Sequence, residues 1–182
     1  RQRAYDALAS HFESTWQTLY QQLHNNQAYV YTGAAAGQRA LKNIALRQLA
    51  TVSDETLTLV QNQYDSTDNM TDRIAALSIA VNHFPIAAIP MLANFYQRYA
   101  NEALVIDKWF AVQAANSHVS HNAIAQTLDD LLNHPAFIKP NPNRLRALIF
   151  TFCNANPHHF HQTDGSGYDF WAKHVLDIDL KN

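Results

Sequence analysis

Three histidines lie within four residues, at His158, His159 and His161, and a His-rich tract of this kind is a candidate metal site. A closed structural zinc site uses four ligands, however, and consecutive side chains in a turn point in different directions. A second pair, His118 and His121, has the i, i+3 spacing of one helix face but lies in a segment that interrupts a helical pattern. We therefore predict that neither group binds a metal.

Residues 165–167 read Gly-Ser-Gly just before an aromatic-rich helical pattern. Such a segment could cradle a phosphate, because the first N–H groups of a helix have no intrahelical partner. Asp164 and Ser166 can accept hydrogen bonds from the same N–H groups, and the fuller glycine pattern of a nucleotide-binding loop is absent from the sequence. The pattern favours a helix cap over a phosphate site.

Arg144 and Arg146 are the strongest candidates for a binding function. In a helix they lie roughly 200° apart, on opposite sides of an apolar stripe, so at most one of them faces a given cavity. Both could be solvated, or one could bind a peptide carbonyl or carboxylate through its planar guanidinium. The residues alone leave both interpretations open.

Two further groups of residues are predicted to serve packing. In the run Asp107-Lys108-Trp109-Phe110, we expect Trp109 in the core and a surface ion pair from Asp107 and Lys108. The one cysteine, Cys153, adjoins a buried stripe and is interpreted as a small apolar filler rather than a reactive thiol. The absence of a disulfide framework agrees with a reducing compartment, and a cytoplasmic location is predicted.

The chain of 182 residues is long enough for one domain with a sizeable core. Its formal net charge of −2, without a basic stripe, argues against a nucleic-acid partner. No apolar run approaches the ~20 residues of a membrane span, so no membrane partner is predicted. Both ends of the chain fall in helical patterns. We therefore expect a single domain over residues 1–182, a fragment of a larger protein truncated at both ends.

The elements that position these residues are predicted to be helices, because apolar residues recur at i, i+3, i+4 and i+7. The first is long, over 5–23, and the second carries Leu41, Ile44, Ala45 and Leu49. The fifth is expected to begin near Pro90, since proline is tolerated only in a first helical turn. The other stripes fall within 57–64, 74–81, 105–112, 124–132, 145–152 and 168–178.

Nine helical patterns with short connectors predict an all-α fold. Antiparallel pairs of helices of this length are typical of an α-solenoid of HEAT or armadillo character.

Five sequence motifs, in order along the chain, also carry a family resemblance. They are RALKN with its following leucines (39–49), NMTDRIAALS (69–78), DKWF (107–110), NPNRLR (141–146) and the NP-x-x-FH-x-x-DGSGY loop (156–168). Together they resemble the C-terminal helical domain of bacterial zinc aminopeptidases of the aminopeptidase N type, the M1 family. The resemblance covers roughly residues 35–180.

The resemblance implies a curved superhelix of helix pairs that caps the active site of a catalytic domain in the same polypeptide and limits access to short peptides. It implies zinc in the parent enzyme, and it places the second arginine of NPNRLR, Arg146, on the wall of the substrate cavity. The HExxH pair of a zinc peptidase is absent from the sequence, so we assign no catalytic residue and no cofactor to this fragment.

A second hypothesis is a free-standing helical-repeat module that binds another protein on its concave face. The parent reading frame separates the two hypotheses. An upstream HExxH supports the peptidase domain, whereas a start codon just before Arg1 supports the free-standing module.

Overall fold

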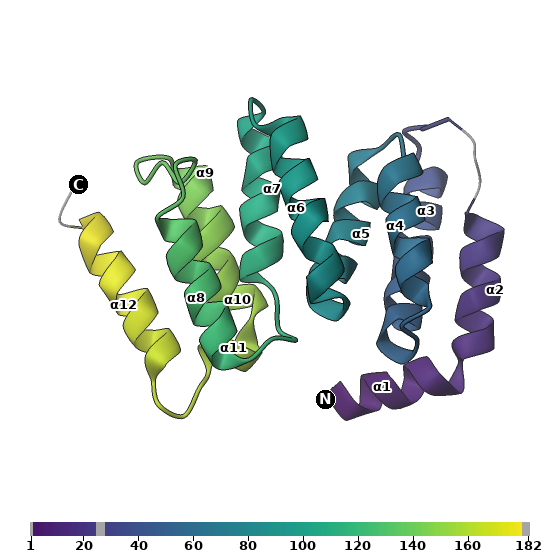
Figure 1. Ribbon diagram of the computed structural model, residues 1–182, viewed down its shortest axis with the longest axis horizontal. Helices are drawn as coiled ribbons and strands as arrows, with labels where there is room; N and C mark the ends of the chain where they lie inside the picture. The colour runs from purple at the N-terminus through teal and green to yellow at the C-terminus, as the bar shows by residue number, and fades with distance from the viewer. Residues whose placement is uncertain (1, 25–27, 180–182) are drawn as a thin grey trace. The chain divides into compact units, whose positions relative to one another are not determined.

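The computed structural model of the protein describes residues 2–24 and 28–179. Every regular element in these two ranges is a helix and none is a strand, which confirms the predicted all-α class (Figure 1). The chain divides into two compact units, residues 1–89 (unit 1) and residues 90–182 (unit 2). The single domain expected over 1–182 stays a prediction.

Unit 1 contains the helices α1 (Gln2–His11), α2 (Glu13–Leu23), α3 (Gly33–Val52), α4 (Thr56–Ser66) and α5 (Met70–His83). Helix α3 is its centre, because α1, α2, α4 and α5 all pack against it. The buried apolar side chains come mostly from α3, α4 and α5, and Leu46, Val60 and Leu77 are fully buried.

Helix α6 (Pro85–Tyr99) contains the boundary between the units. Unit 2 continues with α7 (Ala103–Ala114), α8 (His121–Leu132), α9 (Pro142–Leu145), η1 (Arg146–Phe150), α10 (Thr151–Ala155), α11 (Pro157–Phe160) and α12 (Ser166–Asp179). Its core includes Phe95, Phe110, Ile124 and Leu148, each at most 1% exposed.

Polar side chains begin several of these helices, because an N-cap side chain satisfies an N–H that has no partner within the helix. The caps are Thr32 for α3, Asn69 for α5, Ser120 for α8 and Asn141 for α9. Pro142 occupies the first turn of α9, where its missing N–H costs nothing.

The long first helix predicted over 5–23 is wrong, because the backbone leaves the helical conformation at Phe12 (φ −109°, ψ 22°). The break lets α1 and α2 pack separately on α3. The apolar residues that suggested one stripe, Tyr5, Leu8 and Phe12, are 41–51% exposed, and α1 buries Ala9 instead.

The predicted start of the fifth helix near Pro90 is also wrong. Helix α6 begins at Pro85, where a proline is tolerated, and continues through Pro90. An interior proline costs about 3 kcal/mol. Burial of Ala88, Met91 and Phe95 on one face offsets this cost.

The second predicted stripe is partly wrong. Leu41 and Ile44 are about 40% exposed, and the buried face of α3 is rotated so that it includes Lys42 together with Ala45 and Leu49.

Candidate functional site

The predicted cavity residue, Arg146, lies in a continuous helical stretch made of α9, η1 and α10. Residues 146–150 form a π-helical turn within it, and Arg146 begins that turn. Its side chain is exposed, and its guanidinium has no hydrogen-bond or ion-pair partner among the described residues. Single π-helical turns inside α-helices are rare and occur frequently at functional sites. The helical periodicity does not indicate this turn.

Arg144, two residues earlier, is only 4% exposed, so the interpretation of two solvated arginines is wrong for this residue. Its Nε lies 2.8 Å from Asp107 Oδ1, and a terminal nitrogen donates to the Ala103 carbonyl at 3.3 Å. The guanidinium also lies over the Phe110 ring, 4.7 Å from its centroid. These contacts tie the start of α9 to α7, which is a structural role.

The same contacts correct the prediction for Asp107. Its ion pair is formed with Arg144 rather than with Lys108, and the Asp107 side chain is only 14% exposed, so the pair does not lie on the surface. Trp109, which the sequence placed in the core, is 8% exposed.

The segment from Asn156 to Tyr168 is held by polar contacts that explain its motif. Asn156 is fully buried and its Nδ2 donates to the carbonyls of Ala114 and Asn116, at 3.1 and 2.8 Å. His161 Nδ1 lies 2.7 Å from the hydroxyl of Tyr168. These contacts fasten the loop to the end of α7 and to α12.

The Gly-Ser-Gly segment serves the backbone, as predicted. Asp164 Oδ1 accepts a hydrogen bond from the Ser166 N–H at 3.0 Å, and Gly165 has a φ of 78°, which favours glycine. A Cβ on Gly167 would overlap the backbone carbonyl of Phe160. The segment therefore forms a turn and a close helix contact.

The histidines of the 158–161 tract have different environments. His158 and His161 are exposed, whereas His159 is 1% exposed and burial lowers its pKa, with the neighbouring His158 and His121 adding to the effect. His121 Nε2 lies 3.2 Å from Ser166 Oγ. Within residues 2–24 and 28–179, no group of three or more His, Cys, Asp or Glu side chains is placed to hold a metal ion. The side chains in these two ranges therefore do not fit a zinc site.

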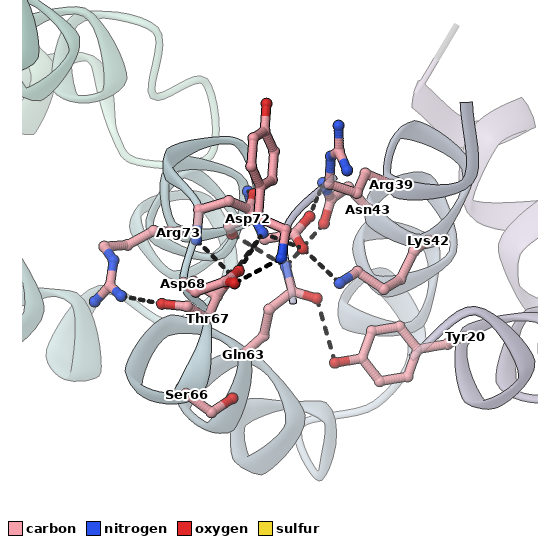
Figure 2. Close-up of polar contacts among 12 residues, drawn as sticks. Tyr20, Arg39, Lys42, Asn43, Gln63, Ser66, Thr67, Asp68, Asp72 and Arg73 are labelled. Atoms are coloured by element: carbon pink, nitrogen blue, oxygen red, sulfur yellow. Dashed lines mark hydrogen bonds and ion pairs between the residues drawn. The ribbon is translucent and has the colours of Figure 1, made fainter. Parts of the chain in front are cut away.

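Unit 1 contains a buried polar cluster, made of Lys42 and Asn43 from α3, Gln63 from α4, Asp72 from α5, and Tyr20 from α2 (Figure 2). Lys42 Nζ lies 2.6 Å from Asp72 Oδ2, and these residues are 7% and 3% exposed. Asn43 donates to the other carboxylate oxygen at 2.9 Å. Asp72 thus links α3 to α5.

Gln63 extends the cluster to α2. Its amide nitrogen donates to Asn43 Oδ1 and to the Asp72 carbonyl, and its oxygen accepts from the Tyr20 hydroxyl at 3.3 Å. Burial, with the negative charge of Asp72 as a second cause, raises the pKa of Tyr20 to about 12. The phenol is therefore neutral at physiological pH and acts as a donor.

A cavity of about 500 Å³ adjoins this cluster. Its wall includes Lys42 and Asp72, and also Arg39 and Asp68. Asp68 accepts a hydrogen bond from the Tyr29 N–H at 2.8 Å, which is the main reason that the pKa of its carboxyl is lowered. Arg39 donates to the Val30 carbonyl and lies over the Tyr29 ring.

Sequence reasoning missed this cluster. Lys42 and Asn43 lie in the RALKN motif and Asp72 lies in the NMTDRIAALS motif, where the pattern gives them no role. The available signal was spacing, because Lys42 lies three and seven residues before the buried Ala45 and Leu49 on one helix face. Asp72 lies four residues before the buried Ala76 in the same way. A charged residue at a core position indicates a buried partner.

Comparison with known proteins identifies what the chain is similar to. A family model described as a domain of unknown function, DUF3458_C, with ARM repeats matches residues 1–182. Aminopeptidase N of Caulobacter vibrioides is 36% identical over 178 residues, which cover 96% of this chain and 20% of that protein. Aminopeptidase N of Escherichia coli is 33% identical over 178 residues, 97% of this chain and 19% of that protein.

Among solved structures, Legionella pneumophila aminopeptidase A in complex with aspartic acid matches with a TM-score of 0.86 and 26% identity, over 100% of this chain and 22% of that chain. This chain spans about a fifth of the length of the curated relatives and matches a C-terminal domain of aminopeptidase N. The helical-repeat character predicted from the sequence is confirmed by the ARM repeats of the family model. The chain belongs to the DUF3458_C family of ARM-repeat domains.

Proposed function

We propose that this chain is the non-catalytic C-terminal domain of a zinc-dependent aminopeptidase of the M1 family, in which it caps the active site and limits access to short peptides. The observation that carries the proposal is the match of almost the whole chain to one fifth of aminopeptidase N. The remaining four fifths of such a polypeptide would supply the catalytic domain and the zinc. The absence of HExxH from this sequence supports that division of roles.

In this proposal the domain encloses the site where the parent enzyme cleaves the N-terminal residue of a peptide. Exclusion of bulk water from that site would strengthen the electrostatic interactions of the bound peptide. The same enclosure would keep folded chains out. We place the enzyme in the cytoplasm, in keeping with a single cysteine. No helix in the described part of the chain is long and apolar enough to cross a membrane.

Arg146 is the residue that we assign to the cavity wall. Its exposed guanidinium, which has no partner in the described ranges, and its place at the start of a π-helical turn support this role. The buried Arg144, two residues earlier, anchors the same stretch to Asp107 and so gives Arg146 a fixed backbone. A fixed guanidinium can bind a carboxylate or peptide carbonyl with two hydrogen bonds.

The capping role is tested by deleting this domain from the parent enzyme. We compare kcat/KM for a tetrapeptide with kcat/KM for a long unfolded polypeptide. Removal of this domain should raise kcat/KM for the long polypeptide relative to kcat/KM for the tetrapeptide. Addition of the separate 182-residue chain should reverse this change. An unchanged ratio in a folded, active enzyme would contradict the capping role.

The role of Arg146 is tested by Arg146→Ala in the parent enzyme. Loss of a charge-assisted contact of roughly 1.5 to 3 kcal/mol should lower kcat/KM about 10- to 150-fold for peptides that reach the wall, mostly through KM. A single-residue chromogenic substrate should change little. Arg47→Ala removes the same charge from an exposed position of α3 and is the matched control. Equal effects of the two substitutions would contradict the role of Arg146 and favour the interpretation of a solvated arginine.

A further inference from the structure

The buried ammonium of Lys42 has spare donors on the wall of the unit 1 cavity. Its side chain is only 9% exposed, and Asp72 Oδ2, at 2.6 Å, is its one acceptor among the described residues (Figure 2). An ammonium has three N–H donors, so two are left without a protein acceptor in this part of the chain. The cavity is open to solvent, so an acceptor that enters it can reach these donors.

Asp72 is not available as a ligand-binding carboxylate. Its oxygens accept from Lys42, from Asn43 at 2.9 Å and from Asn69 Nδ2 at 3.2 Å. Its function is to hold the Lys42 ammonium in place. The hydrogen-bond donors that remain for a ligand therefore belong to the Lys42 ammonium.

Among the described residues, the cavity wall carries two cations, Lys42 and Arg39, and two anions, Asp72 and Asp68. Burial, with the Lys42 charge as a second cause, lowers the pKa of the neighbouring His24, so this imidazole is neutral at pH 7. The balanced charge disfavours a polyphosphate, which Asp68 and Asp72 would repel, and matches a ligand that carries one charge of each sign.

The remaining lining is suited to a small polar ligand. Amide and hydroxyl groups from Gln38, Ser66 and Thr67 line the cavity and can bind a peptide group. A volume of about 500 Å³ falls in the range of small-molecule sites, roughly 300 to 1,000 Å³.

We propose that this cavity binds a small zwitterion of the amino acid or dipeptide class, with its carboxylate accepting from Lys42 Nζ and its ammonium facing the exposed Asp68. The site lies wholly within unit 1 and does not depend on the proposed peptidase function. It would give the domain a binding activity of its own.

Calorimetric titration of the 182-residue chain at pH 7 tests the ligand class. L-alanyl-L-alanine should bind saturably with one molecule per chain. The C-terminal amide of this dipeptide, which has no carboxylate, should bind at least about 10-fold more weakly, because the lost contact is charge-assisted. The N-acetyl dipeptide should bind a few-fold more weakly, because Asp68 is solvent-exposed. Inorganic phosphate should not compete.

Two substitutions locate the binding. Asp68→Asn keeps an oxygen for the Tyr29 N–H but removes the charge, so it should weaken the dipeptide and leave the N-acetyl dipeptide unchanged. Lys42→Met should abolish binding of both, whereas Lys108→Met, at an exposed site in α7, should have no effect. If Lys42→Met fails to fold by circular dichroism, the Asp68→Asn result with the two dipeptides decides.

The proposal is overturned if no dipeptide binding is detected up to about 10 mM. It is also overturned if the dipeptide and its amide bind equally, or if Asp68→Asn leaves all affinities unchanged. None of these three results would affect the capping test, which measures substrate length in the parent enzyme.

Discussion

Arg144 and Arg146 lie two positions apart on one helical stretch and have opposite environments, which leads to a prediction about stability. Arg144→Ala leaves the nearly buried carboxylate of Asp107 without its cation. Removing one partner of a buried ion pair costs about 3 to 5 kcal/mol, so the free energy of unfolding should fall by roughly that amount. Arg146→Ala removes an exposed side chain and should change it by less than about 0.5 kcal/mol.

Urea unfolding of the two variants checks this difference. The double variant Arg144→Ala/Asp107→Ala is the control, because removal of both charges should recover part of the loss. Equal stability of the two single variants would contradict the assignment of Arg144 as an internal tie.

The thiol of Cys153 is predicted to react slowly. Burial raises the pKa of its thiol to about 11, so the reactive thiolate is scarce at neutral pH. Alkylation by iodoacetamide at pH 8 should therefore be at least about 10-fold slower than for an unstructured cysteine peptide. The urea-unfolded chain is the control and should react at the peptide rate. Fast alkylation of the folded chain would restore the interpretation of a reactive thiol.

The sequence predicted these residues unevenly, for physical reasons. Helical angles placed Arg144 and Arg146 on opposite sides of a stripe, but the pairing of Arg144 with Asp107 depends on the packing of α9 against α7. The Lys42 cluster joins residues up to 43 positions apart, such as Tyr20 and Gln63. No local spacing specifies such a contact.

The junction between α11 and α12 is set by one glycine. A Cβ at Gly167 would overlap the Phe160 carbonyl, so Gly167→Ala forces the two helices apart. Overpacking of this kind costs typically 1 to 3 kcal/mol, and the melting temperature should fall. Gly33→Ala, where a Cβ would have nothing within 4 Å, is the control and should leave stability unchanged or raise it. Equal melting temperatures of both variants and the parent chain would contradict the close contact.

Periodicity and capping residues predicted most of the helices. They did not predict where a helix is interrupted. The break at Phe12 follows from the separate packing of α1 and α2 on α3, which is tertiary information. Helix α6 passes through Pro90 because burial on one face outweighs a local rule. The π-helical turn at 146–150 lies within an unbroken helical pattern, so periodicity could not indicate it.

Histidines with lowered pKa values in both units predict that the whole molecule is sensitive to acid. Burial lowers the pKa of His134, His159 and His174 in unit 2, and of His24 in unit 1. Below pH 6.5 these histidines therefore bind protons more readily in the unfolded chain than in the folded chain. The free energy of unfolding should stay level above pH 6.5 and fall as the pH is lowered from there toward the folded values.

Urea unfolding at pH 7.5 and pH 5 measures the loss of stability. Hydrogen exchange should report a larger loss in peptides from unit 2 than in those from unit 1, because three of these four histidines belong to unit 2. His159→Gln should reduce the pH dependence more than His158→Gln, because His158 is exposed and lowers the pKa of His159 only as a secondary cause. A pH dependence that is the same with and without His159 would remove this residue from the explanation.

The Lys42–Asp72 ion pair also has a consequence for how the chain finds its fold. The apolar faces of repeat helices are chemically alike, so a helix shifted by one turn, or paired with the wrong neighbour, would bury nearly as much carbon. Such a shift would leave Asp72 in an apolar interior without Lys42 and Asn43, which is a heavy penalty. We infer that the ion pair determines which helix α5 packs against, and also the helical turn of α3 at which the two helices meet.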